Sequence, residues 1–345
     1  MGRRCTYEPR IVPDEVRALK SDRPDCSVIV TTFNRADLLE GGLEALARQE
    51  TPTGLEWELV VVDNNSIDRT RDVVREFSRV VPFSVRYRFE GRQGQAYARN
   101  AGVEEARGRV LAFTDDDILP APNWVAALTT KLASGDLDGV GGSVIPQWEE
   151  TPPVWLMRRP NLQPWLALTS AKEPMLLTYP LRLAARIVGA NMAFKRTIFE
   201  EFGGFDTALG HRGRMPYGLE ETAFVNGLLK SGRVIAFDPE IRVSHRITPR
   251  RMRRSFFVRR VFCHEAASVW LEPVGPASGV ITLFGVERWR YRSLMGALAR
   301  TVWRHATHQP TALEAQLDLA REAGTIWGQL VRRSSPRANG PASSV

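Results

Sequence analysis

The sequence is poor in cysteine and has no long apolar run. Its three cysteines in 345 residues, Cys5, Cys26 and Cys263, lie far apart and form no Cys-x-x-Cys pair. This spacing excludes a disulfide framework and the usual zinc sites. No stretch approaches the about 20 uncharged apolar residues that cross a bilayer, and the first ten residues lack the apolar core of a signal peptide. We therefore expect a cytoplasmic protein that is not integral to a membrane.

The composition is that of a basic globular protein. Hydrophobic residues make up 43% and charged residues 25%, which excludes disorder of the whole chain. The formal net charge is +8 and the pI is near 9.8. Such a charge favours an anionic partner, which could be a nucleotide diphosphate, an acidic membrane surface or nucleic acid.

Short runs rich in valine and isoleucine alternate with amphipathic segments from Cys26 to about Lys230. This alternation predicts an α/β fold with a mostly parallel sheet flanked by helices. The strands expected first are 26–31, 58–63, 84–87 and 109–114. Ligands bind beyond the carboxyl ends of such strands, so Asn34, Asp63 and the run 115–117 should meet at one edge.

Capping residues predict two helix starts. Asn34 is at an N-cap position with Asp37 in the capping-box position, which predicts a helix over about 35–49. Ser66 can cap a second helix, which Pro82 ends at the latest.

The later part of the chain changes character. Prolines interrupt 147–186, where Trp148, Trp155 and Trp165 stand, so we expect a long functional loop with short helical pieces there. Further helices are expected over 250–270, 286–305 and 311–332.

One apolar strand ends in three consecutive carboxylates, Asp115, Asp116 and Asp117. If the chain stays extended, Asp115 and Asp117 share a face and Asp116 points the other way. Two carboxylates on one face suit Mg²⁺ or Mn²⁺, which is commonly held by one or two carboxylates plus substrate phosphates. Alternatively, the run caps a helix that Pro122 could begin. The run alone does not choose between these roles.

Two more segments have both a functional and a structural interpretation. Arg99, on a helix expected around 94–102, would suit a diphosphate, but the small residues beside it also predict a helix packed on the sheet with Arg99 solvated. Glu220 and Glu221 open another helix, where acidic residues complement the helix dipole. A carboxylate there could also serve as a general base.

Seven short motifs follow one another along the chain. They are Ser27–Arg35, Val62–Asp68, Ala98–Gly102, Phe113–Asp117, Gly189–Phe194, Phe202–Asp206 and Glu220–Thr222. In these residues and in this order, the chain resembles family 2 glycosyltransferases with a GT-A fold, over roughly 24–245. The resemblance implies a Rossmann-like α/β domain.

The resemblance also implies roles for single residues. The nucleotide-binding residues would be Thr32, Phe33, Asn34, Arg35, Asp63, Asn65, Arg99, Asp115 and Asp116. Among them, Asp63 would accept a hydrogen bond from the base, usually uracil. Asp115 and Asp117 would be the family's Asp-x-Asp pair, with Asp117 on the metal and Asp115 facing ribose and metal. His245 would add a metal or diphosphate contact, although a lone histidine after a strand is often structural.

The acceptor side departs from the family's pattern. The family usually has Glu-Asp where this chain has Glu220-Glu221, and the second residue is the usual catalytic base. Glu221 is one methylene longer and could still reach an acceptor. Trp148, Trp155 and Asn191 are expected on the acceptor side, where tryptophans could stack on sugar rings. Packing of these tryptophans against the carboxy-terminal helices is equally economical.

The resemblance implies a GT-A catalytic domain (25–245, with a donor half 25–120 and an acceptor half 121–245). Around it the residue pattern predicts an N-terminal arm (1–24), a helical C-terminal extension (246–332) and a disordered tail (333–345).

The activity implied is inverting transfer of a sugar from a nucleotide diphosphate, usually UDP, to a hydroxyl or amine, assisted by Mn²⁺ or Mg²⁺. The acceptor would be a carbohydrate, a lipid-linked molecule or a secondary metabolite, and no nucleic acid is expected. Since Glu221 replaces the usual aspartate, a non-catalytic nucleotide-sugar-binding or carbohydrate-binding protein is one alternative. Another is a membrane-surface protein that binds through its basic segment 250–270, which can equally be a packed helix with a solvated basic face.

Overall fold

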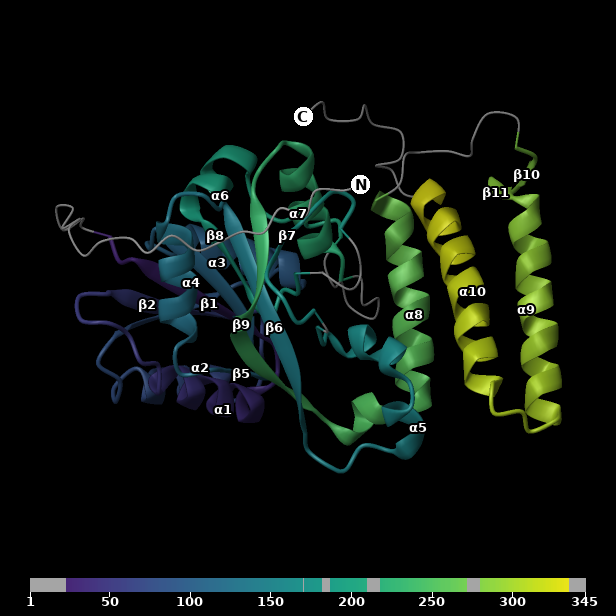
Figure 1. The fold of residues 1–345 in the computed structure, drawn as a ribbon, viewed down its shortest axis with the longest axis horizontal. Helices are drawn as coiled ribbons and strands as arrows, with labels where there is room; N and C mark the ends of the chain where they lie inside the picture. The colour runs from purple at the N-terminus through teal and green to yellow at the C-terminus, as the bar shows by residue number, and fades with distance from the viewer. Residues whose placement is uncertain (1–22, 170, 182–186, 210–217, 272–279, 335–345) are drawn as a thin grey trace. The chain divides into compact units, whose positions relative to one another are not determined.

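A nine-stranded sheet organises the first of two units in the computed structural model, which describes residues 23–334 except 170, 182–186, 210–217 and 272–279 (Figure 1). The first unit comprises Met1–Gln147, Ala167–Phe205 and Phe224–Arg246, and the second comprises Trp148–Leu166, Asp206–Ala223 and Ile247–Val345. Nearly all of the expected tail and of the expected N-terminal arm lies outside the described residues, and residues 333 and 334 of the expected tail belong to a helix. No helix in the described part of the chain is both long and apolar enough to span a membrane.

The first unit holds most of the strands, in the order β3-β2-β1-β4-β8-β6-β9-β5, with β7 paired to β9. The strands are β1 (Cys26–Thr32), β2 (Trp57–Asp63), β3 (Ser84–Phe89), β4 (Val110–Asp115), β5 (Ile118–Pro120), β6 (Gly139–Trp148), β7 (Met175–Leu176), β8 (Met192–Lys195) and β9 (Ile235–Ile247). Pairing is parallel among β3, β2, β1 and β4, and antiparallel between β4 and β8. The predicted α/β class and the four predicted strands are confirmed.

Helices accompany this sheet. They are α1 (Ala36–Ala47), α2 (Thr70–Phe77), α3 (Gln95–Glu105), α4 (Trp124–Ala133), α6 (Arg196–Phe202) and α7 (Glu220–Lys230), which begins in the second unit. In β1, Ile29 belongs to the large apolar cluster under α3, while its neighbours Val28 and Val30 point to the opposite face and are equally buried. Both faces of the sheet are therefore covered.

The small residues of α3 let it pack closely on the sheet. A Cβ atom at Gly102 would lie 2.4 Å from Ile29 Cγ2 and 3.2 Å from Val62 Cγ2. Ala98 and Ala101 are buried on the same helix. The predicted packing of this helix on the sheet is confirmed.

The second unit is mainly helical. Its elements are α5 (Val154–Met157), the 3-10 helices η1 (Pro160–Leu166), η3 (Pro249–Met252) and η4 (Val269–Leu271), the helices α8 (Arg254–Ser268), α9 (Arg288–Ala306) and α10 (Ala312–Ser334), and the short strands β10 (Thr282–Leu283) and β11 (Val286–Glu287). The three predicted carboxy-terminal helices are confirmed, as are the short helical pieces in 147–186.

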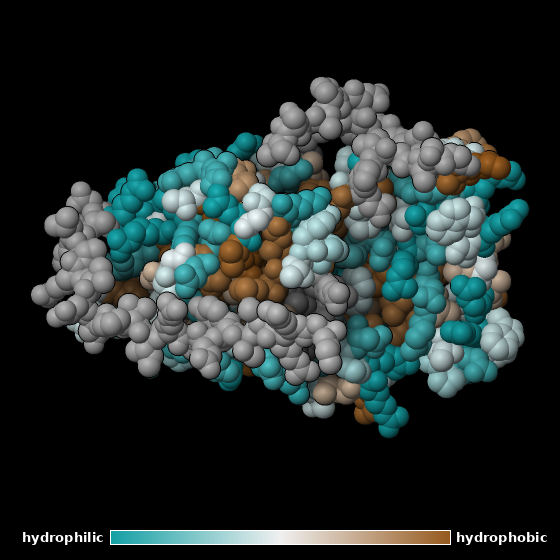
Figure 2. Space-filling model, turned by 45° about the horizontal axis from the view of Figure 1, so that its top comes forward, coloured by the Kyte–Doolittle hydropathy of each residue, from teal (hydrophilic) through white to brown (hydrophobic). Residues whose placement is uncertain are grey.

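Two glycines bring α10 close to α8. A Cβ atom at Gly324 would lie 2.4 Å from the Phe262 carbonyl oxygen, and one at Gly328 would lie 2.3 Å from that of Ala266. Phe257 and Val261 of α8 are fully buried. The apolar side of the basic segment is thus used for packing inside this unit. The surface drawn in Figure 2 is largely hydrophilic, with separate brown, apolar patches.

Candidate functional site

The carboxyl ends of three parallel strands lie side by side in the first unit. In the sheet register, Thr32 at the end of β1 pairs with Asp63 at the end of β2. On the other side, Thr31 pairs with Asp115 at the end of β4. Their loops therefore start from one edge, as the sequence predicts.

The acidic run does not continue as a strand. The chain turns at Asp116 and Asp117 between β4 and β5, so the simple alternation of faces along the run is wrong. The run caps no helix either, because α4 begins at Trp124 and has no side-chain cap. The three carboxylates instead contact side chains from other elements.

Arg35 bridges two of these carboxylates. Its Nη1 lies 3.1 Å from Asp116 Oδ1 and 3.4 Å from Asp117 Oδ2. Thr32 Oγ1 donates to Asp116 Oδ2 at 2.9 Å. Burial raises the pKa of Asp116 well above its ordinary value, although the guanidinium of Arg35 acts in the opposite direction. The guanidinium of Arg35 therefore neutralises part of the negative charge of the acidic run.

The carboxylate of Asp115 is oriented from α3. Gln95 Nε2 donates to Asp115 Oδ1 at 3.0 Å, and Arg99 Nη2 lies 3.5 Å from the same oxygen. Arg99 is only 3% exposed, so the prediction of a solvated side chain is wrong. Space for its guanidinium exists because Gly189 has no side chain: a Cβ atom there would lie 2.0 Å from Arg99 Nη2.

Asp117 has a histidine neighbour. His245 Nε2 lies 3.6 Å from Asp117 Oδ2, and both side chains are buried. The pairing of β5 with β9 sets this distance, since Ile118 stands opposite His245. His245 is among the predicted residues, but its contact with Asp117 depends on strand pairing that the sequence does not show.

The donor set suits a divalent cation that also binds phosphate. No group of three or more His, Cys, Asp or Glu side chains in the described residues is arranged to hold a metal ion by itself. A nucleotide-bound Mg²⁺ needs only one or two protein carboxylates, because phosphate and water oxygens complete its shell. Asp115, the last residue of β4, and Asp117, in the turn directly after it, could supply these carboxylates.

The loops after β1 and β2 are fastened to each other. Asn34 N donates to Ser66 Oγ at 2.9 Å, and Ile67 N donates to Asn34 Oδ1 at 2.8 Å. Asn34 has a φ of 50° and is not a helix cap. Both predicted caps are therefore wrong, because Asn34 and Ser66 bind each other's loop.

Asp68 performs the capping that those residues do not. Its Oδ2 accepts from the amide of Ala36 at 3.0 Å, at the start of α1, and its Oδ1 accepts from the amide of Thr70 at 3.1 Å, at the start of α2. Partial burial acts to raise the pKa of Asp68, but the hydrogen bonds from Thr70 and Ala36 hold it below its ordinary value. This capping role of Asp68 is not among the predictions, although a carboxylate two positions before a helical threonine is a capping signal.

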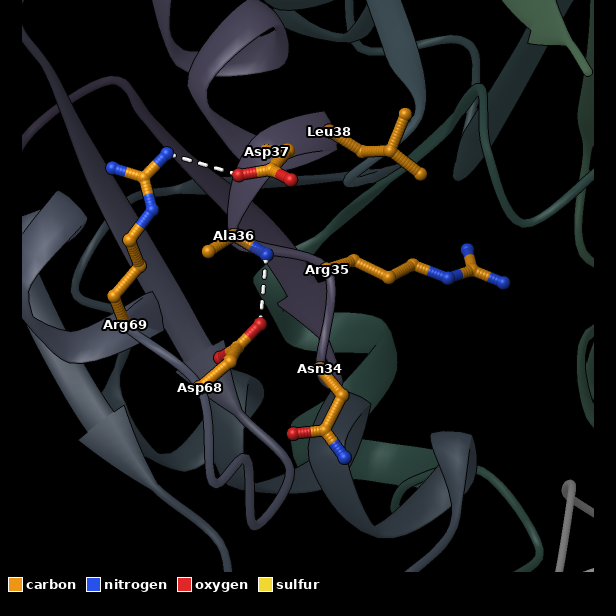
Figure 3. A pocket seen from close by; sticks show the side chains of 7 residues that line it. All are labelled: Asn34, Arg35, Ala36, Asp37, Leu38, Asp68 and Arg69. Atoms are coloured by element: carbon orange, nitrogen blue, oxygen red, sulfur yellow. Dashed lines mark hydrogen bonds and ion pairs between the residues drawn. The ribbon is translucent and has the colours of Figure 1, made fainter.

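These loops line an open pocket of about 510 Å³ (Figure 3). Its lining residues are Asn34, Arg35, Ala36, Asp37, Leu38, Asp68 and Arg69. Figure 3 shows the Arg35 side chain pointing away from Asp68 and Arg69. Arg69 instead lies 2.9 Å from Asp37. The pocket therefore adjoins the loop from which Arg35 reaches the acidic run.

Asp63 is buried at the end of β2. It accepts hydrogen bonds from Tyr87 Oη at 2.7 Å and from Ser66 N at 2.8 Å. Of the other predicted nucleotide residues, Phe33 and Asn65 are exposed, and Asn65 has a φ of 69°.

Asn64, which the sequence analysis did not single out, fastens the loop after β3. Its Oδ1 accepts from Gly94 N, and its Nδ2 donates to the carbonyls of Glu90 and Arg92. At this edge of the sheet, Asn64 is therefore buried and held by hydrogen bonds, whereas Phe33 and Asn65 are exposed.

The predicted acceptor residues have varied surroundings. Asn191 is fully buried, and its amide joins Trp124 Nε1 to the carbonyls of Ser143 and Ile241. Trp155, in the second unit, packs edge to face on Phe257, with ring centroids 5.8 Å apart. Trp148 is half-buried. These contacts favour the packing interpretation for Trp155, and an acceptor role for the three residues stays a prediction.

Glu220 and Glu221 form the first turn of α7 and are both buried. The helix runs as the sequence predicts. Residues 210–217, shortly before this helix, lie outside the described part of the chain. The role of either glutamate as a base stays a prediction.

Residues 27–203, slightly more than half of the chain, match the family model for glycosyl transferase family 2. The chain belongs to this family. A glucosyl-dolichyl phosphate glucuronosyltransferase from Haloferax volcanii is 28% identical over 68% of this chain and 74% of its own length. The glycosyltransferase AglE from the same organism is 33% identical, but the match covers only 36% of this chain and 41% of AglE.

The solved structures that this chain resembles also have the GT-A fold. A mannosyltransferase from Pyrobaculum calidifontis, solved with GDP-Man and Mn²⁺, has 21% identity and a TM-score of 0.56, with 92% of this chain and 91% of that chain covered. TarS from S. aureus, residues 1–349 with UDP, has 15% identity and a TM-score of 0.50 over 90% and 92% of the two chains. At these identities the likeness establishes the fold alone.

Proposed function

We propose that this family 2 protein transfers a sugar from a nucleotide diphosphate donor to an acceptor hydroxyl or amine. The observation that carries the proposal is the arrangement of Asp115, Asp116 and Asp117 with Arg35 and His245 at one edge of the sheet. Carboxylates and a guanidinium that meet at strand ends suit a ligand with both phosphate and metal.

The donor is proposed to bind along the carboxyl ends of β1, β2 and β4. Asp63 would accept a hydrogen bond from the base, and the guanidinium of Arg99, which lies beside Asp115, would contact the diphosphate. The donor would be a UDP sugar, by resemblance to the family. TarS was solved with UDP and the Pyrobaculum enzyme with GDP-Man, so direct comparison of UDP and GDP binding decides the base.

Asp115 and Asp117 are proposed to hold Mn²⁺ or Mg²⁺, with His245 as a further ligand. The Pyrobaculum neighbour was solved with Mn²⁺. When bound, such a cation would stabilise negative charge that develops on the departing diphosphate. Arg35 would move from sharing its guanidinium between Asp116 and Asp117 to facing the phosphates.

Glu221 is proposed as the general base, with Glu220 as the neighbouring candidate. The acceptor oxygen or nitrogen would bond to the anomeric carbon as the bond from that carbon to the diphosphate oxygen breaks. The acceptor's proton would pass to the Glu221 carboxylate. A single displacement of this kind inverts the anomeric centre.

A lipid-linked acceptor is the favoured class among carbohydrate, lipid-linked and secondary-metabolite acceptors. One relative that aligns over most of both chains is a glucosyl-dolichyl phosphate glucuronosyltransferase, and another is the succinoglycan biosynthesis protein ExoM of Rhizobium meliloti. Validoxylamine A glucosyltransferase, 40% identical over 32% of this chain, supports the alternative of a small metabolite.

Asp117→Asn tests the donor site, with Asp72→Asn as a matched control because Asp72 is exposed on α2. Nucleotide release from a panel of UDP and GDP sugars is measured with Mn²⁺. Asp117→Asn should lose at least about 99% of the activity, because the metal contributes several kcal/mol to the transition state. Normal turnover by Asp117→Asn would refute the proposed site.

Glu221→Gln separates catalysis from binding. This variant should bind the nucleotide sugar normally, as measured by calorimetry, but transfer it at least about a hundredfold more slowly. Full activity would remove Glu221 as the base. Donor binding without turnover in the unmutated protein, with every acceptor class tried, would favour the non-catalytic binding protein instead.

A further inference from the structure

The hairpin β10–β11 of the second unit exposes a group of apolar side chains. Val280, Ile281, Leu283 and Phe284 are 38%, 67%, 47% and 79% exposed. Figure 2 shows brown, apolar atoms at the upper right, on the side where Figure 1 labels β10 and β11. Single exposed apolar residues are normal on a protein surface, but four within five positions indicate a surface that binds something.

The turn of the hairpin is strained in a way that folding does not explain. Leu283 pairs with Val286, so Phe284 and Gly285 form the two-residue turn, with φ values of 53° and 77°. Such turns favour Asn-Gly or Gly-Gly because both positions need a positive φ. A phenylalanine there is an outlier, and its exposure means that little packing offsets the strain. An outlier of this kind is a reason to look for a function.

The base of the hairpin is fixed. Val286 is fully buried, and Tyr291 Oη donates to the Leu283 carbonyl at 3.2 Å. Glu287 Oε2 lies 2.6 Å from Arg290 Nε and accepts from Gln329 Nε2 at 3.2 Å. The exposed tip is therefore held on a firm support, which limits the entropy lost when it binds.

Positive charge is concentrated in the same part of the chain. Residues 248–334 contain fourteen of the 47 basic residues and six of the 39 acidic residues, a net charge of +8. The rest of the chain has 33 of each and is neutral. Arg288 and Arg292 are exposed beside the hairpin, one helical turn apart on α9. This excess of positive charge favours a second anionic partner here, besides the nucleotide proposed to bind at the sheet edge.

We propose that the tip of β10–β11 inserts into a membrane surface that carries anionic lipids, while Arg288 and Arg292 contact the headgroups. Apolar side chains gain free energy by leaving water, and arginines beside them are attracted to negative lipids. Trp289, which is 53% exposed at the start of α9, has the amphipathic ring that favours the interface.

A second copy of the chain fits this surface less well. A symmetric dimer would bring the same patch of each copy together, and Arg288 and Arg292 would then face their own counterparts. Like charges brought together in this way oppose association. A lipid surface offers both the apolar phase and the opposite charge.

Vesicle co-sedimentation of the full chain tests the proposal, without donor or acceptor, so that its result is independent of the proposed transferase activity. The vesicles are pure phosphatidylcholine or an equal mixture of phosphatidylcholine and phosphatidylglycerol, each at low and high salt. The test variant is Phe284→Asn, because asparagine is a preferred residue in this turn and should fold at least as stably. Val80→Asn is the matched control, since Val80 is also 79% exposed but lies in the first unit.

The unmutated protein should bind the anionic vesicles, and more weakly at high salt. Phe284→Asn should lower the partition coefficient about tenfold or more while its thermal midpoint stays equal or rises. Arg288→Glu with Arg292→Glu should remove most of the preference for anionic vesicles, and Val80→Asn should change nothing. The proposal is overturned if Phe284→Asn binds the vesicles as well as the unmutated protein does. It is also overturned if no form of the protein binds vesicles and the unmutated protein is a dimer that Phe284→Asn dissociates.

Discussion

Replacing Gly189 with alanine tests how Arg99 is held beside the acidic run. The new Cβ atom would lie 2.0 Å from Arg99 Nη2 and 2.6 Å from Cζ, far inside van der Waals contact. Gly189 does not have a positive φ, so alanine causes no backbone strain. The guanidinium is 3% exposed and lies over the Phe205 ring at 5.8 Å, so it has little room to move away.

The expected cost follows from this overpacking. Extra atoms in a well-packed interior typically cost about 1 to 3 kcal/mol of the free energy of unfolding. In an Arg99→Ala background the clashing atoms are gone, so Gly189→Ala should change stability by less than about 0.5 kcal/mol. The coupling between the two substitutions should then be about 1 to 3 kcal/mol. Donor affinity should fall in both single variants, because each removes the guanidinium from Asp115.

Urea unfolding of the four proteins in this double-mutant cycle measures the coupling, and calorimetry measures nucleotide binding. Gly227→Ala is the control for a glycine-to-alanine change, because nothing lies within 4 Å of its added Cβ atom inside α7. That control should raise stability by about 0.5 to 1 kcal/mol. Equal destabilisation by Gly189→Ala with and without Arg99 would show that the clash is not with this side chain.

Three further results are expected. Asp68→Ala should lower the free energy of unfolding by about 2 kcal/mol, measured in urea, because two helix starts lose their cap; Asp68→Asn, which keeps an acceptor oxygen, should cost less. Trp155→Ala should lower stability by about 2 kcal/mol through lost packing on Phe257, and a higher Michaelis constant for the acceptor in addition would support an acceptor role. A chelator should abolish the thermal shift that a UDP sugar induces and leave the midpoint of the free protein unchanged, and Mn²⁺ should restore the shift.

The strands and the carboxy-terminal helices were predictable because each is encoded locally. Runs of valine and isoleucine ending in polar residues determine where β1, β2 and β4 stop. Parallel strands then bring those ends to one edge. Residue order alone therefore places Asp63 near the acidic run 115–117.

The contacts around that edge depend on residues far apart in sequence. Arg99 is buried because Gly189, ninety positions later, leaves room for it. Asp68 caps a helix that starts 32 residues earlier. Local capping rules therefore selected Asn34 and Ser66, which are instead bonded to each other's loops. The periodicity of apolar residues along the chain does not predict contacts between residues so far apart in sequence.

The carboxylate of Asp68 has a consequence for engineering. Because one side chain closes the segments after both β1 and β2, exchanging either segment with that of a relative would break the hydrogen bonds of the other. A chimaera intended to accept a different nucleotide must therefore transplant 33–36 and 64–70 as a pair.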